Sequence, residues 1–263
     1  MIHAHIHDNL GISIGNFLIP YYGLMIILGL FAAFLVGYYQ IKKYNLSIDD
    51  FILLLSTSGI FAIIGSKLLF LTVSWKHIDF KRLTDLKYLN EIMAGGFVFY
   101  GGLIGALIGV FISKKIFKIN IKMYLQYCTP VIPILHFFGR IGCFLVGCCY
   151  GEPFESNFSV TYTHSLFAPN NIPLFPTQLT EATALLLIGI FLLIYINKFK
   201  GKYAFELYIL LYGVIRFILE FFRYDSYRGI IFGFSTSQYI SIFLIFSVLF
   251  FFFYKKKQIE KTF

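Results

Sequence analysis

The stretch FLIPYYGLMIILGLFAAFLVGYY, residues 17–39, contains no charged residue. A helix needs about 20 consecutive apolar residues to cross the hydrocarbon core of a bilayer, so this stretch predicts one membrane-spanning helix. The basic pair Lys42 and Lys43 follows it, as is typical of a span that ends on the cytoplasmic side. Residues 1–9 have no Lys or Arg and so lack the basic region of a cleaved signal peptide. We therefore expect this span to be retained.

Apolar blocks of similar length recur along the whole chain. Of its 263 residues, 58% are hydrophobic and only 13% are charged, whereas a soluble domain carries about a quarter charged residues. We predict an all-α integral membrane protein with a single membrane domain over residues 1–263. The seven predicted spans, with boundaries soft by several residues, are 17–39, 51–73, 96–113, 123–145, 178–197, 203–222 and 236–254.

The basic residues are concentrated in alternate loops between these blocks. A formal net charge of +9 can accompany nucleic-acid binding, but clusters at the ends of spans are the pattern that marks the cytoplasmic side of a membrane protein. We expect no nucleic-acid partner, an N-terminus outside the cytoplasm and a C-terminus inside it. Thirteen of the 22 basic residues define the cytoplasmic side: Lys42, Lys43, Lys114, Lys115, Lys118, Lys122, Lys198, Lys200, Lys202, Lys255, Lys256, Lys257 and Lys261.

Two segments on the opposite, outer side are long enough to have structure of their own. Residues 77–92 place an apolar residue at every third position from Phe80 to Leu89, with charged residues between, which is typical of an amphipathic helix on a membrane surface. Residues 151–176 contain four prolines around a strand-like stretch. We expect this second segment to be an extracytoplasmic loop or cap.

Polar side chains within the predicted spans gather at one depth. An ionisable residue inside a span costs at least a few kcal/mol and needs a partner or a wet cavity. With the predicted orientation these residues lie in the outer half of the membrane, Glu206 excepted, which predicts a central cavity open to the outer leaflet. They are Tyr22, Lys67, Tyr100, Arg140, Gln178, Glu181, Arg216, Glu220 and Arg223.

Arg140 and Arg216 come from different predicted spans. Guanidinium groups suit anions with paired oxygens, and the anion available in a membrane is a phospholipid phosphate. We expect both arginines to bind phosphate, and Glu220, four residues after Arg216 on the same helix face, to orient it. The alternative for Glu220 with Arg223 is a self-contained ion pair that anchors the end of the helix.

The fourth predicted span is irregular. Pro130 and Pro133 should break its hydrogen-bond ladder. The segment GRIGCFLVGCCYG, residues 139–151, has four glycines and three cysteines, which indicates irregular backbone around a ligand. In the third span the glycines at every fourth position from 101 to 109 indicate close helix packing instead.

Three interpretations are open for the cysteines Cys143, Cys148 and Cys149. A disulfide from Cys143 to either of the others is one, although sequence cannot assign the pairing. A zinc site with His136 would need ligand spacings that this segment lacks, so we expect no metal and no cofactor. A functional thiol is the third, at Cys143 above all, because it lies three residues from Arg140 and shares its helix face.

Six short motifs, in a fixed order, carry a resemblance to a known family. They are YYGLM at 21–25, YGGLIG at 100–105, the Pro130-x-x-Pro133 pair with GRIG at 139–142, PTQLTE at 176–181, YGVIRFILEFFR at 212–223 and SQ at 237–238. On a seven-span layout they resemble the prolipoprotein diacylglyceryl transferases of bacteria.

The resemblance implies a reaction and its partners. Such an enzyme, a multi-pass protein of the bacterial plasma membrane, takes phosphatidylglycerol from the outer leaflet. It moves the diacylglyceryl group onto the lipobox cysteine of a prolipoprotein and releases glycerol phosphate. Arg140 and Arg216 fit this reaction as phosphate-binding and catalytic residues, and we expect Tyr22, Gln178, Glu220 and Gly151 to complete the substrate site.

The chain departs from the family at several polar positions. The family signature has Asn, Asn and Glu where this chain has Cys143, Val146 and Cys148, and His where it has Tyr100. A phenol is a poor base at neutral pH. Because cysteine and tyrosine still carry chemistry, we interpret the chain as a divergent member in which Tyr100 and Cys143 take part in catalysis.

Three other functions fit the same residues. A paralogue would transfer the lipid group to another acceptor, and a second, signature-complete transferase in the same genome would favour it. A lipid-binding or transport protein would keep the cavity without releasing glycerol phosphate. A thiol–disulfide membrane protein would use the cysteines alone.

Overall fold

The computed structural model describes residues 2–4, 11–14, 17–79, 82, 84–85, 88, 92, 98–224 and 229–260. The chain forms two compact units, one of residues 1–44 with 125–263 and one of residues 45–124. Helices dominate both, as expected from the apolar composition.

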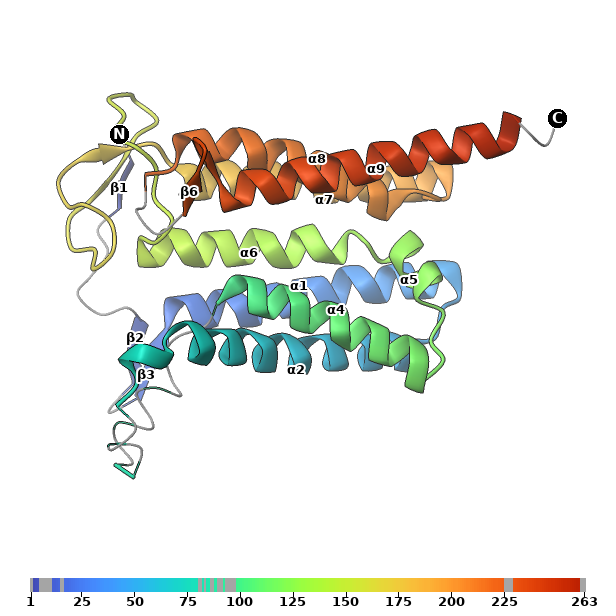
Figure 1. Ribbon diagram of the computed structural model, residues 1–263, viewed down its shortest axis with the longest axis horizontal. Coiled ribbons are helices and arrows are strands. Elements are labelled where there is room, and N and C mark those ends of the chain that lie inside the picture. The colour runs from blue at the N-terminus through green and yellow to red at the C-terminus, as the bar shows by residue number, and fades with distance from the viewer. Residues whose placement is uncertain are drawn as a thin grey trace. The chain divides into compact units, whose positions relative to one another are not determined.

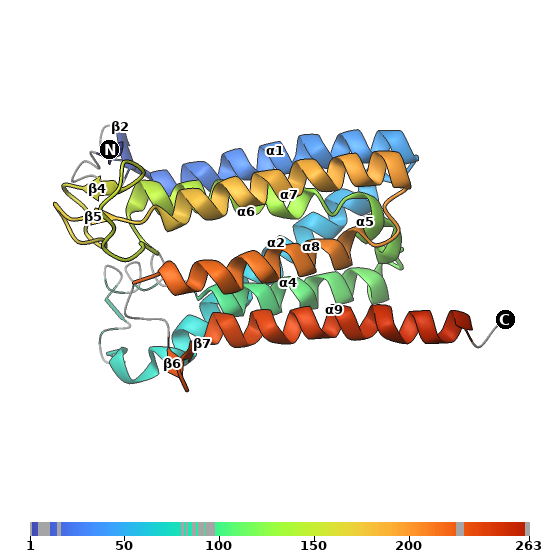
Figure 2. The same cartoon turned by 90° about the horizontal axis from the view of Figure 1, so that it is seen from above.

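Five long helices build the first unit. They are α1 (Tyr21–Tyr44), α6 (Val131–Val146), α7 (Thr177–Phe199), α8 (Ala204–Leu219) and α9 (Thr236–Glu260), and the short 3₁₀ helix η3 (Glu220–Phe222) continues α8. Successive pairs pack together, α1 on α6, α6 on α7, α7 on α8 and α8 on α9. The five run side by side in both views (Figures 1 and 2).

Small residues and helix ends explain this packing locally. A Cβ on Gly29 of α1 would lie 2.8 Å from the Cβ of Phe138, so glycine allows α1 to approach α6 closely. The last turn of α1 carries Lys42 and Lys43, which complement the negative end of the helix dipole. The predicted span 17–39 starts too early, because residues 17–20 form a strand and the helix begins only after Pro20.

Short strands cap the bundle at the end where α6 stops and α7 starts (Figure 1). Strands β1 (Ile2–Ala4), β4 (Val160–Tyr162) and β5 (Pro173–Leu174) form one sheet, in which β1 pairs parallel and β5 antiparallel with β4. Among the described residues, β2 (Gly11–Ile14) also pairs antiparallel with β3 (Phe17–Pro20), and β6 (Ile230–Ile231) pairs antiparallel with β7 (Phe234–Ser235).

A small core supports this cap. Val160, Tyr162, Ala168 and Leu174 are buried together, so the segment 151–176 is folded. Its position outside the cytoplasm stays a prediction.

The second unit consists of α2 (Ile48–Val73), η1 (Trp75–His77) and α4 (Phe99–Ile116); α5 (Ile121–Tyr127) leads from it back to the first unit. A Cβ on Gly109 would lie 2.7 Å from the Cα of Ser58, and one on Gly105 would overlap the carbonyl of Phe61. The glycine stripe therefore packs α4 on α2, as predicted. The predicted interfacial helix 77–92 lies largely outside the described residues.

The break in the fourth predicted span is present. Helices α5 and α6 meet at 63°, and Pro130 lies between them because proline cannot continue the hydrogen-bond ladder. Pro133 is tolerated inside α6, since amides in the first helical turn have no intrahelical acceptor.

Within the described residues, five helices are long and apolar enough to cross a membrane, or six if α5 and α6 form one bent span. The chain is therefore a multi-pass helical membrane protein. Helix α8 has only 16 residues, and the count of seven spans and the orientation stay predictions.

Candidate functional site

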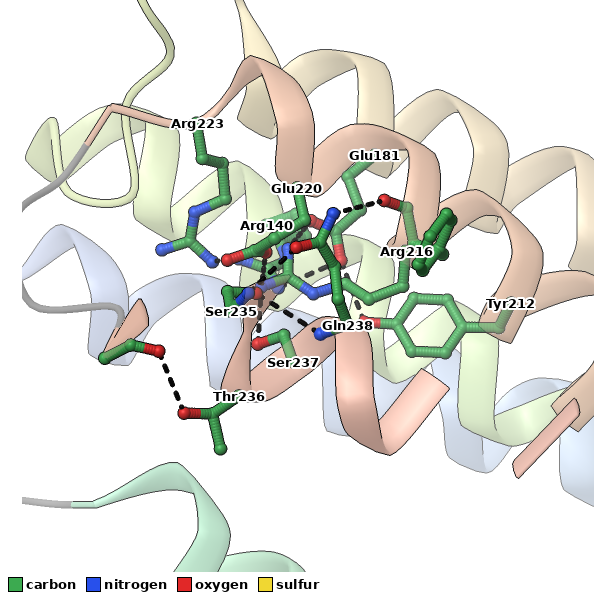
Figure 3. Close-up of polar contacts among 12 residues, drawn as sticks. Arg140, Glu181, Tyr212, Arg216, Glu220, Arg223, Ser235, Thr236, Ser237 and Gln238 are labelled. Carbon is green, nitrogen blue, oxygen red and sulfur yellow. Dashed lines mark hydrogen bonds and ion pairs between the residues drawn. The ribbon is translucent and has the colours of Figure 1, made fainter. Parts of the chain in front are cut away.

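A buried carboxylate joins two arginines from neighbouring helices. Glu181, in the second turn of α7, is 1% exposed. Its Oε1 lies 2.9 Å from Nη2 of Arg140 on α6, and its Oε2 lies 3.3 Å from Nη1 of Arg216 on α8. The hydroxyl of Tyr212 also donates to Oε1, at 2.9 Å. Figure 3 shows these side chains converging from the three helices.

A second carboxylate holds Arg216 from its own helix. Oε2 of Glu220 lies 2.7 Å from Nη2 of Arg216 and 3.6 Å from Nη1 of Arg223. Nη2 of Arg216 also donates to Oγ of Ser237, at 3.2 Å. The spacing of four and three residues places all three charged groups on one helix face, and Arg216 is thereby fixed between two carboxylates (Figure 3).

The start of α9 is arranged so that Ser237 reaches Arg216. The amide of Ser235 donates to Oε1 of Gln238 at 2.9 Å, and the amide of Gln238 donates to Oγ of Ser235 at 3.2 Å. This reciprocal pair is a capping box, which satisfies amides at a helix N-terminus. The sequence Ser-Thr-Ser-Gln therefore fixes the first turn of α9 beside the ion pairs.

The charges of this cluster do not cancel. Three arginines, Arg140, Arg216 and Arg223, face two carboxylates, Glu181 and Glu220, which leaves one surplus positive charge. Nε of Arg140 is buried and has no hydrogen-bond partner among the described residues. A buried donor beside a surplus positive charge suits an oxyanion, because charge-assisted hydrogen bonds to anions are strong.

Three thiols meet where α6 ends. The sulfur atoms of Cys143, Cys148 and Cys149 all lie within 4.8 Å of one another. Gly147 ends the helix in the left-handed conformation (φ 81°), and its amide donates to the carbonyls of Cys143 and Phe144. Cys149 also has a positive φ of 60°. All four cysteines of the chain are free, so the structure contains no disulfide here.

The two thiols beyond the end of α6 differ in acidity. Hydrogen bonds from Cys143 and Cys148 lower the pKa of Cys149, and the guanidinium groups of Arg223 and Arg140 act in the same direction. The hydrogen bonds with Cys143 and Cys149 raise the pKa of Cys148. Negative charge within the cluster is therefore favoured at Cys149.

Gln178 and Tyr22 flank the thiol loop. Gln178, 2% exposed, donates from Nε2 to the carbonyl of Cys148 at 2.8 Å and to the hydroxyl of Tyr162 at 3.4 Å. A Cβ on Gly142 would lie 2.9 Å from Cδ2 of Tyr22. Gly142 therefore provides the space in which the Tyr22 ring packs against α6.

Gly151 brings the loop against the start of α7. It forms an isolated bridge with Arg223, and a Cβ there would lie 2.5 Å from Oγ1 of Thr177. The backbone around it is tied to η3, since the amide of Glu152 donates to the carbonyl of Phe222 at 2.9 Å. A larger residue at 151 would therefore overlap Thr177 and force the loop or the start of α7 to shift.

The structure brings most of the predicted site residues into this one region of the first unit: Tyr22, Arg140, Cys143, Gly151, Gln178, Arg216 and Glu220. Tyr100 and Lys67 belong to the second unit, where Tyr100 lies in the first turn of α4 and Nζ of Lys67 donates to the carbonyl of Ile92. A role for Tyr100 stays a prediction.

Three members of the cluster were not among the site residues predicted from the sequence. Glu181 was one of the intramembrane polar residues but not a proposed site residue. His136, whose Nε2 lies 3.9 Å from Oε1 of Glu181, and Tyr212 are the others. His136 and Tyr212 each lie four residues before an arginine of the cluster, and this spacing was the available signal for them. His136 thus lies with the carboxylates, and the group of three thiols forms without it.

Comparison with known proteins gives a consistent result. Residues 9–254 match the family described as prolipoprotein diacylglyceryl transferase. The phosphatidylglycerol–prolipoprotein diacylglyceryl transferase of Clostridium tetani is 40% identical over 228 residues, which cover 85% of this chain and 88% of the relative. A transferase of the same name, numbered 2, from Clostridium perfringens is 35% identical over 85% of this chain and 86% of its own length. One from Dehalococcoides mccartyi is 31% identical over 95% of both chains.

Proposed function

The chain belongs to the prolipoprotein diacylglyceryl transferase family, and we propose that it moves the diacylglyceryl group of phosphatidylglycerol onto the lipobox cysteine thiol of a prolipoprotein. A carbon–sulfur bond forms at the glyceryl carbon, the bond from that carbon to the phosphate oxygen breaks, and glycerol phosphate leaves with the electron pair. The thiol gives up its proton. The names of the relatives support the donor and the acceptor.

One observation carries the assignment of the site: two arginines from different helices are bridged by the buried Glu181, and their cluster of three arginines and two carboxylates has one surplus positive charge. The leaving group is a phosphate ester on which negative charge develops. Fixed guanidinium groups stabilise such charge at little reorganisation cost. We assign Arg140 and Arg216 to the phosphate. One donor is Nε of Arg140, which has no hydrogen-bond partner in the described part of the chain.

Glu181 and Glu220 are positioning residues in this account. They fix the planes of the two guanidinium groups and prevent the charges from repelling each other. Tyr22, Gln178 and Gly151 shape the adjoining loop, where the lipobox peptide would approach the phosphate. With the orientation predicted from the basic loops, we expect the site to lie towards the outer leaflet of the bacterial plasma membrane.

One competing function is a protein that binds phospholipid through the arginine cluster without catalysing transfer. The observation that favours it is the presence of Cys143, Val146 and Cys148 in place of the residues of the family signature. Both functions predict lipid binding. Only the transferase predicts release of glycerol phosphate and a gain in mass on the acceptor.

Complementation tests the proposed function in the cell. A strain whose resident transferase is depleted should recover growth and lipoprotein maturation when it expresses this chain, and fail to recover with Arg216→Ala expressed at equal level. Binding of phosphatidylglycerol by the purified protein, without complementation and without release of glycerol phosphate, would support the binding protein instead.

A further inference from the structure

The three thiols at the end of α6 have the composition and spacing of a metal-binding group. Their sulfur atoms lie within 4.8 Å of one another. In a tetrahedral zinc site with Zn–S bonds of about 2.3 Å, sulfur atoms are roughly 3.8 Å apart. The sulfur atoms would therefore have to approach one another by at most about 1 Å to bind one ion. Side-chain rotation can supply this displacement.

The backbone already directs these thiols toward one point. Gly147 reverses the chain, and the carbonyl of Cys143 accepts the amides of Gly147 at 2.9 Å and Cys148 at 3.1 Å. Cys149 is held at φ 60°, a conformation that residues with a Cβ adopt rarely and that clusters at functional sites. Gln178 fixes the carbonyl of Cys148 from α7.

The charge around the cluster suits a thiolate–metal complex. Three thiolates and one divalent cation carry a net charge of minus one. The guanidinium groups of Arg140 and Arg223 both act electrostatically on Cys149, and the arginine cluster has one surplus positive charge. The three cysteines are partly exposed, so an ion can reach them.

We propose that Cys143, Cys148 and Cys149 bind Zn²⁺ through three thiolates and leave its fourth coordination position open. Zinc prefers sulfur and nitrogen ligands in tetrahedral sites, and sites with three protein ligands keep the fourth for water or substrate. This assignment replaces the expectation from the sequence that the chain binds no metal.

The open position has a natural occupant, and this step rests on the proposed function. The lipobox thiol binds Zn²⁺ and loses its proton to water, since a thiol on zinc is deprotonated. Its sulfur then bonds to the glyceryl carbon while the bond from that carbon to the phosphate oxygen breaks, and glycerol phosphate leaves. No electron is gained or lost. Zinc would thus supply the deprotonation of the lipobox thiol.

Metal content and cobalt substitution test the site itself. The full-length protein, purified in detergent, should contain about one Zn²⁺ per chain, and Co²⁺ should give a thiolate-to-cobalt charge-transfer band. The control Cys128→Ala, at a buried cysteine outside the group, should keep both signals. Cys143→Ser/Cys148→Ser/Cys149→Ser should lose both. Absence of zinc and of the cobalt band in the wild-type protein, or a disulfide found by thiol labelling with and without reductant, would overturn the proposal.

A lipobox peptide tests the fourth position. The peptide should change the spectrum of the Co²⁺ protein, whereas the peptide with serine in place of cysteine should not. An unchanged spectrum with the cysteine peptide overturns the open position. If the protein binds zinc but has no transfer activity, the proposed function is refuted and the zinc site is not. If metal-free protein has full transfer activity, the zinc proposal is refuted and the proposed function is not. Each single serine variant should lower the transfer rate at least about tenfold if zinc activates the thiol.

Discussion

Glu181 and Arg140 lie 2.9 Å apart, from Oε1 to Nη2, on two different helices. The other oxygen of the same carboxylate contacts Arg216 on a third helix. One buried carboxylate therefore sets the distance between two guanidinium groups and fixes the relative position of α6, α7 and α8 at the site. Removal of this carboxylate should affect both function and stability.

Glu181→Gln tests this bridge. The amide can still accept from Tyr212, but it leaves two buried arginines without their shared anion, and loss of one partner of a buried ion pair costs about 3–5 kcal/mol. We expect a lower thermal midpoint and a transfer rate reduced at least about 100-fold. Glu206→Gln, a change of the same kind at the start of α8, is the control and should leave both unchanged. Wild-type rate and stability in Glu181→Gln would contradict the bridging role.

The Tyr22 contact gives a steric prediction. Gly142→Ala places a Cβ 2.9 Å from the Tyr22 ring, and forced overpacking typically costs about 1–3 kcal/mol. We expect displacement of Tyr22, a lower thermal midpoint and a reduced transfer rate. Gly59→Ala on α2 is the matched control, because a Cβ there meets nothing within 4 Å. Equal thermal midpoints and equal transfer rates in the two variants would show that the position of Tyr22 does not depend on Gly142.

The membrane orientation can be measured directly. Reporter fusions on the side rich in lysine should score cytoplasmic and the others external, because basic loops are retained in the cytoplasm. Reversal of any two fusions would refute the orientation and the placement of the site towards the outer leaflet. The cytoplasmic fusions follow Lys43, Lys118, Lys202 and Lys257, and the external ones lie near Lys87 and Asn170.

Much of the fold could be predicted from the sequence, because long uncharged blocks have few alternatives to helices in a membrane. The break at Pro130 and the packing role of the glycines near Gly105 followed from the same reasoning. The first and last residues of the helices were harder to predict than the helices themselves. Helix α1 begins after Pro20 because the preceding residues pair in a hairpin with residues 11–14, and such pairing depends on contacts beyond the span.

The site was predictable only in part. Arg140 and Arg216 could be predicted because a charged residue inside a span is costly and usually has a function. The bridging position of Glu181 could not, because it depends on how three helices pack. For His136 the only signal was its position four residues before Arg140. The three thiols meet where the chain turns through Gly147 and Cys149, both with positive φ. Residues with a Cβ rarely adopt this conformation, so sequence spacing alone did not predict one group of three.

The central claim is that Arg140 and Arg216 hold the phosphate of the lipid donor during transfer, and in vitro transfer tests it most directly. The assay measures release of glycerol phosphate and lipidation of a lipobox peptide by the purified protein in bilayers that contain phosphatidylglycerol. Wild-type protein should form both products in equal amounts. Arg140→Ala and Arg216→Ala, still folded and inserted, should lose at least about 100-fold in rate, and lysine at either position should restore little, because it lacks the paired donors of a guanidinium. Alanine variants that keep the wild-type rate would contradict the account.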